Sequence, residues 1–139
     1  MQYELFQNAN MKLYYSMTDL KWRLYKVSIS KEYDLSMNGN LSCFLEIFYE
    51  EPDSFFKKVY SEIEKRQLSP DIIEDLPFKK AILFCAENRM FFWLELSLKW
   101  IGFLTIDFAF KSGLEKITRA SFFPQNIRHR LHQELKNKG

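Results

Sequence analysis

Hydrophobic and polar residues alternate through a strongly apolar stretch of the chain, MFFWLELSLKWIGFLTIDFAF, residues 90–110. From Phe92 to Trp100 the even positions are apolar, whereas Glu95 and Lys99 stand at odd positions. An alternation of period two is typical of a β-strand with one buried face. A membrane-spanning helix needs about 20 apolar residues with few charges, and the charged side chains, Asp107 included, interrupt this stretch. The pattern therefore predicts a sheet rather than a membrane span.

Gly102 divides this stretch, and the even parity continues beyond it with Leu104, Ile106 and Phe108. A hairpin that keeps these residues on the buried face needs a loop of odd length, for which Ile101-Gly102-Phe103 is suitable. An isolated glycine in a strand also marks bulges. The sequence leaves two arrangements open, a hairpin and one long strand bent at Gly102.

The first third of the chain shows the same period. Residues 11–17, MKLYYSM, alternate as a strand does, and the odd positions of 23–37 and of 41–49 are mostly apolar. Asn-Gly between the last two segments favours a tight turn, because both residues tolerate positive φ. We therefore expect a hairpin closed by Asn38-Gly39-Asn40. That loop would pair Leu35 with Cys43 and Tyr33 with Leu45.

Helical periodicity begins after residue 50. Apolar residues three and four apart, Pro52 in the first turn and bases at the end predict a helix over 52–66. Ser69 and Pro70 can start a second helix, which Pro77 would end within two turns. The apolar run 81–86 favours a buried strand, with a helix from residue 78 as the alternative.

The C-terminal part begins with a predicted turn at 111–113 and a strand to residue 121. Ile127, Leu131 and Leu135 then stand four apart after Pro124, so we expect a C-terminal amphipathic helix. The sum is a single α+β domain over 1–139. It combines antiparallel β-hairpins, one or two central helices and the C-terminal helix.

Composition changes the picture in two ways. Aromatic residues make up 17% of the chain, with 14 Phe, 7 Tyr and 3 Trp, which exceeds the need of a core this size and favours a partner-facing surface. Cys43 and Cys85 lie in apolar runs, which is typical of reduced, inert thiols. The N-terminal residues lack the basic start and apolar core of a secretion signal. These features predict a cytoplasmic protein.

The net charge is only +2, but it is unevenly distributed. Residues 46–75 hold nine acids and four bases, a net charge of −5, and residues 111–139 hold seven bases and two acids, a net charge of +5. We expect a dipolar molecule if the fold keeps these segments apart.

No motif for catalysis stands in the chain. His129 and His132 lie three apart on the predicted C-terminal helix, but a zinc site needs third and fourth ligands at a recognisable spacing. A glycine-rich phosphate loop is also missing from the sequence. We therefore predict a protein that is not an enzyme and has no catalytic residue, no metal site and no cofactor.

Two charged segments are candidate binding surfaces. The first combines acids with aromatic residues, as a surface that meets a basic protein does. It comprises Glu46, Phe48, Tyr49, Glu50, Glu51, Asp53, Asp71, Glu74 and Asp75. The second is basic and is accompanied by two phenylalanines, as in a surface that contacts RNA or DNA. It comprises Arg119, Arg128, His129, Arg130 and His132.

The segment EIFYEEPD, residues 46–53, is the stretch that carries a resemblance to a known class of proteins. In its size, aromatic content and acidic segment the chain resembles the immunity proteins of bacterial toxin–immunity pairs, including those of contact-dependent growth inhibition. This resemblance implies a cytoplasmic α+β protein that binds a cognate toxin domain, often a nuclease, and blocks its active site or an exosite.

The favoured hypothesis is therefore a non-enzymatic protein-binding domain that neutralises a partner protein, an immunity protein against a toxic nuclease. The expected partner is a protein, such as a basic toxin domain, and not a membrane. The alternative is a nucleic-acid-binding protein that uses the basic C-terminal helix, although the near-neutral net charge makes nucleic acid the less favoured partner. A third hypothesis is a homo-oligomeric structural domain, such as a homodimer, that buries the additional aromatics in a self-interface.

Overall fold

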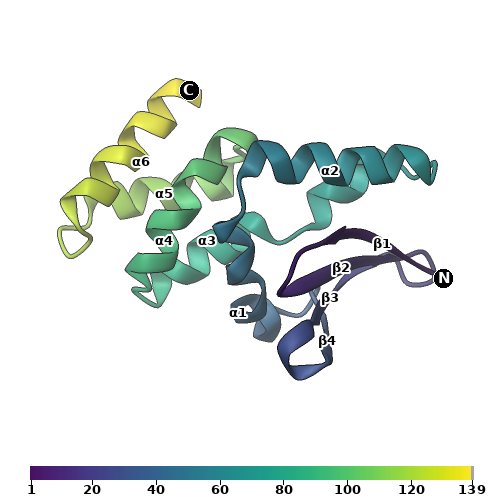
Figure 1. The fold of residues 1–139 in the computed structure, drawn as a ribbon. Coiled ribbons are helices and arrows are strands. Elements are labelled where there is room, and N and C mark those ends of the chain that lie inside the picture. The colour runs from purple at the N-terminus through teal and green to yellow at the C-terminus, as the bar shows by residue number, and fades with distance from the viewer. Residues whose placement is uncertain (139) are drawn as a thin grey trace. The chain divides into compact units, whose positions relative to one another are not determined.

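The structure is a computed structural model that describes residues 1–138 (Figure 1). The chain forms two compact units, Met1–Pro77, called here the sheet unit, and Phe78–Gly139, the helical unit. One four-stranded antiparallel sheet and several helices make the fold α+β, as predicted. The single domain over 1–139 stays a prediction, because compactness alone does not decide whether two units unfold together.

The sheet is a meander of four antiparallel strands in the order of the chain (Figure 1). Its strands are β1 (Gln2–Gln7), β2 (Met11–Ser16), β3 (Lys21–Lys26) and β4 (Lys31–Asp34). Met11, Leu13 and Tyr15 of β2 are buried on the same face as Trp22 and Leu24 of β3. The predicted early strand at 11–17 is therefore confirmed, whereas β1 was not predicted.

The edge strand β1 carries a bulge. Its register with β2 shifts between Glu4 and Phe6, which bends a strand and increases its twist. Next to the bulge, Nη2 of Arg66 donates a hydrogen bond to the carbonyl of Glu4 at 3.3 Å, and its guanidinium lies over the ring of Tyr3.

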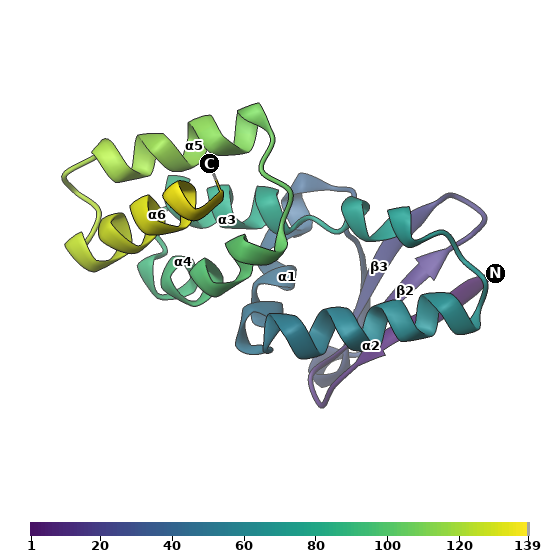
Figure 2. The same cartoon turned by 90° about the horizontal axis from the view of Figure 1, so that it is seen from above.

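Helix α2 (Pro52–Lys65) packs against β1, and Figure 2 shows it running across the sheet. Phe55, Val59 and Ile63 form its buried stripe, and the ring of Phe55 lies 4.8 Å from that of Phe6. The structure thus confirms the predicted helix. The prediction succeeded because the four-residue spacing of apolar residues, the N-terminal proline and the C-terminal bases all indicate a helix.

The predicted short helix after Ser69 is the 3-10 helix η4 (Pro70–Asp75). The Ser69 hydroxyl accepts a hydrogen bond from the backbone amide of Asp71, as a capping residue does. Nε1 of buried Trp22 donates a hydrogen bond to the carbonyl of Ile72 at 2.7 Å. This bond ties η4 to β3.

The predicted hairpin around Asn38-Gly39-Asn40 is wrong. Strand β3 pairs with β4 through the 3-10 turn η1 (Val27–Ile29), and the chain after β4 forms η2 (Asn38–Asn40), α1 (Leu41–Phe44) and η3 (Leu45–Tyr49). Leu35 does not pair with Cys43, nor Tyr33 with Leu45, because Tyr33 is opposite Leu24.

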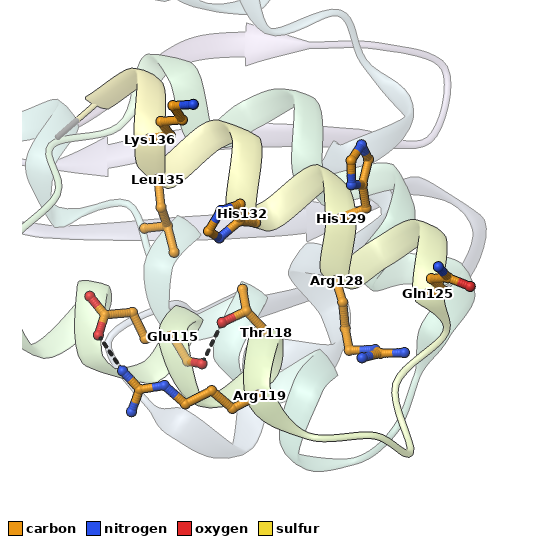
Figure 3. Close-up of a pocket in the computed structure, with 9 residues that line it drawn as sticks. All are labelled: Glu115, Thr118, Arg119, Gln125, Arg128, His129, His132, Leu135 and Lys136. Atoms are coloured by element: carbon orange, nitrogen blue, oxygen red, sulfur yellow. Dashed lines mark hydrogen bonds and ion pairs between the residues drawn. The ribbon is translucent and has the colours of Figure 1, made fainter.

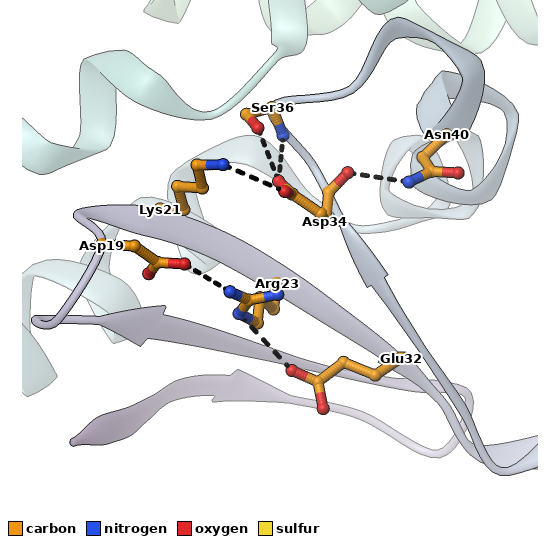
Figure 4. A network of polar contacts seen from close by, with 7 residues as sticks. All are labelled: Asp19, Lys21, Arg23, Glu32, Asp34, Ser36 and Asn40. Atoms are coloured by element: carbon orange, nitrogen blue, oxygen red, sulfur yellow. Dashed lines mark hydrogen bonds and ion pairs between the residues drawn. The ribbon is translucent and has the colours of Figure 1, made fainter.

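Hydrogen bonds to the side chain and to the backbone carbonyl of Asp34 explain why the strand stops there (Figure 4). Its carboxylate accepts from the backbone amide and the hydroxyl of Ser36 at 2.8 and 2.6 Å, and Nδ2 of Asn40 donates to its carbonyl at 2.9 Å. Such local bonds compete with a β-ladder. The Ser36 hydroxyl, followed by the other donors around it, lowers the pKa of Asp34.

The odd-parity interpretation of residues 23–37 is also wrong for most of that segment. Trp22 and Leu24 of β3 are buried, whereas Val27, Ile29 and Met37 are exposed. The alternation observed in the sequence combined a real strand with apolar residues of the following turns, which solvent reaches.

The helical unit consists of α3 (Phe78–Glu87), α4 (Phe91–Ser97), η5 (Leu98–Phe103), α5 (Phe108–Arg119) and α6 (Gln125–Lys138) (Figures 1 and 2). The sheet predicted over 92–110, with its loop at Ile101-Gly102-Phe103 or bulge at Gly102, is therefore wrong. No helix in the described part of the chain has the length and apolar content needed to cross a bilayer.

The sequence of residues 92–110 is compatible both with the two-residue period of a strand and with the period of a helix, and the structure is helical. Leu94, Leu98 and Ile101 stand four and three residues apart, and all three are buried. Phe92, which was predicted to lie on the buried face of a strand, is exposed. Ser97 lies on the buried side as well, and its hydroxyl donates to the carbonyl of Leu94 at 2.6 Å. A polar residue satisfied in this way conceals the apolar stripe of a helix in the sequence.

Two further strand predictions are wrong. Residues 81–86 lie within α3, so the alternative of a helix from Phe78 holds. Residues 111–113, predicted as a turn before a strand to Ser121, lie within α5. The predicted C-terminal helix is present as α6, with Ile127 and Leu131 buried.

Candidate functional site

A groove of about 930 Å³ lies between α5 and α6 of the helical unit (Figure 3). Its walls carry cationic, imidazole and neutral polar side chains with one carboxylate. The lining residues are Glu115, Thr118, Arg119, Gln125, Arg128, His129, His132, Leu135 and Lys136.

Helical spacing explains why these residues share one groove. On α5 the lining positions are 115, 118 and 119, and on α6 they are 125, 128, 129, 132, 135 and 136. Residues three and four apart lie on one face of a helix. The buried residues Leu114 and Ile117 of α5, and Ile127 and Leu131 of α6, occupy neighbouring positions. The apolar stripes are thus covered, and the polar stripes beside them form the groove.

Both ends of α5 are defined by local interactions. Asp107 caps its start by accepting a hydrogen bond from the backbone amide of Phe110 at 2.8 Å, and its carboxylate also lies 3.1 Å from Nζ of Lys79. The amide of Phe110, followed by Lys79, lowers the pKa of Asp107. At the other end, the loop of residues 120–124 turns the chain into α6.

Arg128 is the best-positioned cation of the groove. Its Nε donates a hydrogen bond to the carbonyl of Phe123 at 3.0 Å, and Figure 3 shows its side chain directed from α6 toward the space beside α5. Among the described residues no carboxylate pairs with it, so the two Nη groups remain available to an anion. A guanidinium held through Nε presents the planar fork that binds phosphate or carboxylate.

The other charges of the groove are partly compensated. Arg119 lies 3.3 Å from the carboxylate of Glu115, and the hydroxyl of Thr118 donates to the Glu115 carbonyl at 2.7 Å (Figure 3). Lys136 is exposed. With neutral histidines, three cations and one carboxylate give the lining a net charge of +2.

His129 and His132 both belong to the lining of the groove, although Figure 3 shows the ring of His129 on the opposite side of α6 from the side chain of Arg128. Within the region that the structure describes, no group of three His, Cys, Asp or Glu side chains is arranged to hold a metal ion. As lining residues, both imidazoles can exchange hydrogen bonds with a ligand in the groove.

The structure brings together four of the five basic residues that the sequence identified. Arg119, Arg128, His129 and His132 line the groove, whereas Arg130 is exposed elsewhere on α6. The set predicted from the sequence did not include the other lining residues, which are Glu115, Thr118, Gln125, Leu135 and Lys136. The i, i+3, i+4 spacing from Glu115 and from Arg128 is the signal that could have found them, but α5 was predicted as a turn and a strand.

The acidic candidates do not form one surface. Glu46 lies 3.5 Å from Lys26, and Glu50 accepts a hydrogen bond from Asn8 at 2.6 Å. Asp71, Glu74 and Asp75 lie in or beside η4, which is bonded to Trp22. Residues 22 and 26 of β3 are separated by about 13 Å along a strand, so the two acidic groups lie near different ends of the sheet.

Phe48, one of the two aromatic residues placed on the acidic surface, is completely buried. The predicted surface therefore does not include its side chain. Tyr49 is 57% exposed, and Glu51 and Asp53 beside it are exposed at the start of α2.

Both cysteines are free thiols. Burial raises the pKa of the Cys85 thiol to about 11, so it is protonated at neutral pH, as the apolar run around it predicted.

No protein-family model, curated protein or solved structure matches this chain.

Proposed function

We propose that the protein binds nucleic acid through the α5–α6 groove. The observation that carries this proposal is Arg128, a cation without a carboxylate partner among the described residues that is held by the Phe123 carbonyl at 3.0 Å. Such a preoriented fork can bind a phosphate group in a bidentate manner, and Lys136 and Arg119 add charge along the same groove.

The distribution of charge between the two units supports this proposal. The helical unit holds 11 lysines and arginines against 5 acids, a net charge of +6, whereas the sheet unit holds 9 against 13, a net charge of −4. The near-neutral total thus conceals a strongly basic half. The net charge of the whole chain was the reason to disfavour nucleic acid, and it does not describe the unit that contains the groove.

In this proposal the protein acts by binding and not by catalysis. A reducing compartment such as the cytoplasm suits its two free thiols. Affinity should fall steeply with salt, because each phosphate contact releases counterions.

Fluorescence anisotropy of a short labelled RNA, measured over a series of salt concentrations, tests the proposal. Arg128→Glu with Lys136→Glu should weaken binding about 10- to 100-fold at low salt and make the slope of log affinity against log salt shallower by about two. Arg130→Glu with Lys111→Glu makes the same change of net charge outside the groove and is the matched control. Equal losses in the two double variants, or no binding by the wild type, would contradict the proposal.

A second candidate function, neutralisation of a partner protein as in immunity proteins, is favoured by exposed Tyr49 beside Glu51 and Asp53. An exposed aromatic with acids around it can anchor and steer a basic partner. Co-expression with the product of the neighbouring gene tests this candidate. The candidate is supported if the wild-type protein rescues the cells from toxicity and the double variant Tyr49→Ala with Asp53→Lys does not. If calorimetry detects no complex, that partner is excluded.

A further inference from the structure

The loop that joins the two walls of the groove exposes an aromatic ring. In the sequence, Phe122 stands between Arg119 and Gln125, which both line the groove, and its side chain is 52% exposed. The guanidinium of Arg89, from the turn between α3 and α4, lies 4.3 Å from the centre of its ring. A ring and a guanidinium thus form a stacked pair at the surface of a basic unit.

The neighbouring residues fix this pair in place. Phe123 is buried, and its ring lies 5.7 Å from that of Phe91 and 4.5 Å from that of Phe122. Its amide donates to the carbonyl of Ala120 at 3.2 Å, and its carbonyl accepts the Nε of Arg128. The loop that positions the phosphate-binding fork therefore also positions the exposed ring, one residue away.

We infer that the ligand of the groove is single-stranded nucleic acid, with one base stacked on the Phe122–Arg89 pair and the adjoining phosphates bound by Arg128. This inference rests on the proposed function. Bases of a duplex are stacked on each other, so only an unpaired base can offer its face to a side chain. Because the guanidinium of Arg89 lies over one face of the Phe122 ring, the pair offers the outer face of the guanidinium, with its positive charge, to the base.

Three labelled probes of equal charge per strand test the inference. They are a short single-stranded oligonucleotide, the same strand without bases, and a duplex of equal length. Phe122 supports the guanidinium on which the base stacks, so Phe122→Ala should weaken binding of the normal strand about 5- to 100-fold. The variant should bind the abasic strand and the duplex as the wild type does, because neither offers an unpaired base to the Phe122–Arg89 pair. Phe108→Ala removes a ring that is 86% exposed elsewhere in the helical unit, and this control should bind all three probes normally.

The outcomes separate the inference from the function on which it rests. Suppose that Phe122→Ala binds the normal strand as tightly as Phe108→Ala does, while Arg128→Glu with Lys136→Glu abolishes binding. This result would refute the stacking of a base on the Phe122–Arg89 pair but would support nucleic-acid binding by the groove. If the wild type prefers the duplex to the single strand, the inference is refuted as well. If the wild type binds none of the probes, the proposed function fails, and the inference fails with it. Circular dichroism of each variant verifies that the helices are retained.

Discussion

The side chain of Arg128 and the backbone of Phe123 are joined by a hydrogen bond from Nε to the carbonyl oxygen, 3.0 Å long. Lysine at this position keeps the charge but has no planar fork and no Nε–H. Arg128→Lys should therefore lower the affinity for RNA several-fold and reduce the free energy of unfolding by about 1 kcal/mol. Anisotropy and urea denaturation measure the two effects. Arg130→Lys, exposed on the same helix, should change neither.

Gly39 distinguishes the observed fold from the hairpin that the sequence predicted. Its φ is not positive, and a Cβ added there meets no atom within 4 Å. Gly39→Ala should thus raise the free energy of unfolding by about 0.4–1 kcal/mol, because alanine restricts the unfolded chain. If Gly39 stood in a tight turn with positive φ, Gly39→Ala would instead lower the free energy of unfolding measured by urea denaturation.

Trp22 contributes a buried hydrogen bond in addition to its apolar area. Trp22→Phe removes the donor to the Ile72 carbonyl and leaves a cavity, so it should cost about 2–4 kcal/mol of the free energy of unfolding. Tyr60→Phe, at an exposed aromatic residue of α2, should cost less than about 0.5 kcal/mol. A similar midpoint for both variants in urea would show that η4 is not held by this bond.

The Cys85 thiol should not react in the folded protein. Its pKa is raised to about 11 by burial, so the thiolate is scarce at pH 8 and access is blocked. Titration with a chromogenic disulfide in a Cys43→Ser variant should show reaction of Cys85 only at the rate of unfolding. A fast reaction that is independent of denaturant would contradict the buried position of α3.

Asp107 predicts how acid affects the helical unit. The Phe110 amide and Lys79 hold the pKa of Asp107 below its ordinary value of 3.8, so the folded state favours the ionised form. The resulting stabilisation is present above pH 3.8 and is lost as the pH falls through the lowered pKa. Asp107→Asn can still accept from Phe110 but cannot titrate. The stability of this variant should depend less on pH in that window than the stability of the wild type, and urea denaturation at a series of pH values measures the difference.

The sequence predicted those elements in which several local signals agree. In α2 the spacing of Phe55, Val59 and Ile63 coincides with a proline at the start and a lysine at the end. Ser69 before Pro70 was likewise sufficient to place η4. Capping, dipole and periodicity act within a few residues, so they can be deduced without knowledge of tertiary contacts.

The predictions were wrong for segments whose apolar residues fit both the two-residue period of a strand and the period of a helix. Between Phe92 and Phe110 alternation and helical spacing coexist, and only the surroundings of Leu94, Leu98 and Ile101 decide between them. Tertiary packing, which the sequence does not display, overrides β-propensity in such cases. The Asn-Gly signal failed for a local reason, because the bonds of Asp34 to Ser36 and Asn40 end the strand first.

The candidate site was found in part because charge is visible in a sequence. Arg119, Arg128, His129 and His132 were identified from the basic C-terminal segment and from the spacing of the two histidines, but their convergence depends on α5 being a helix. The acidic set shows the converse. Its members are close in sequence, yet the bond between Trp22 and Ile72 keeps the η4 acids away from those at the start of α2.

The guanidinium of Arg66 occupies a backbone acceptor of the outermost strand, at the point where the bulge bends it. At this edge of the sheet the carbonyl oxygen of Glu4 already accepts a hydrogen bond, and the bulge shifts the register of the strand. Both features hinder the pairing of a strand from a second chain with β1. We therefore expect Arg66 to make the β1 edge a poorer template for the addition of a strand from another chain.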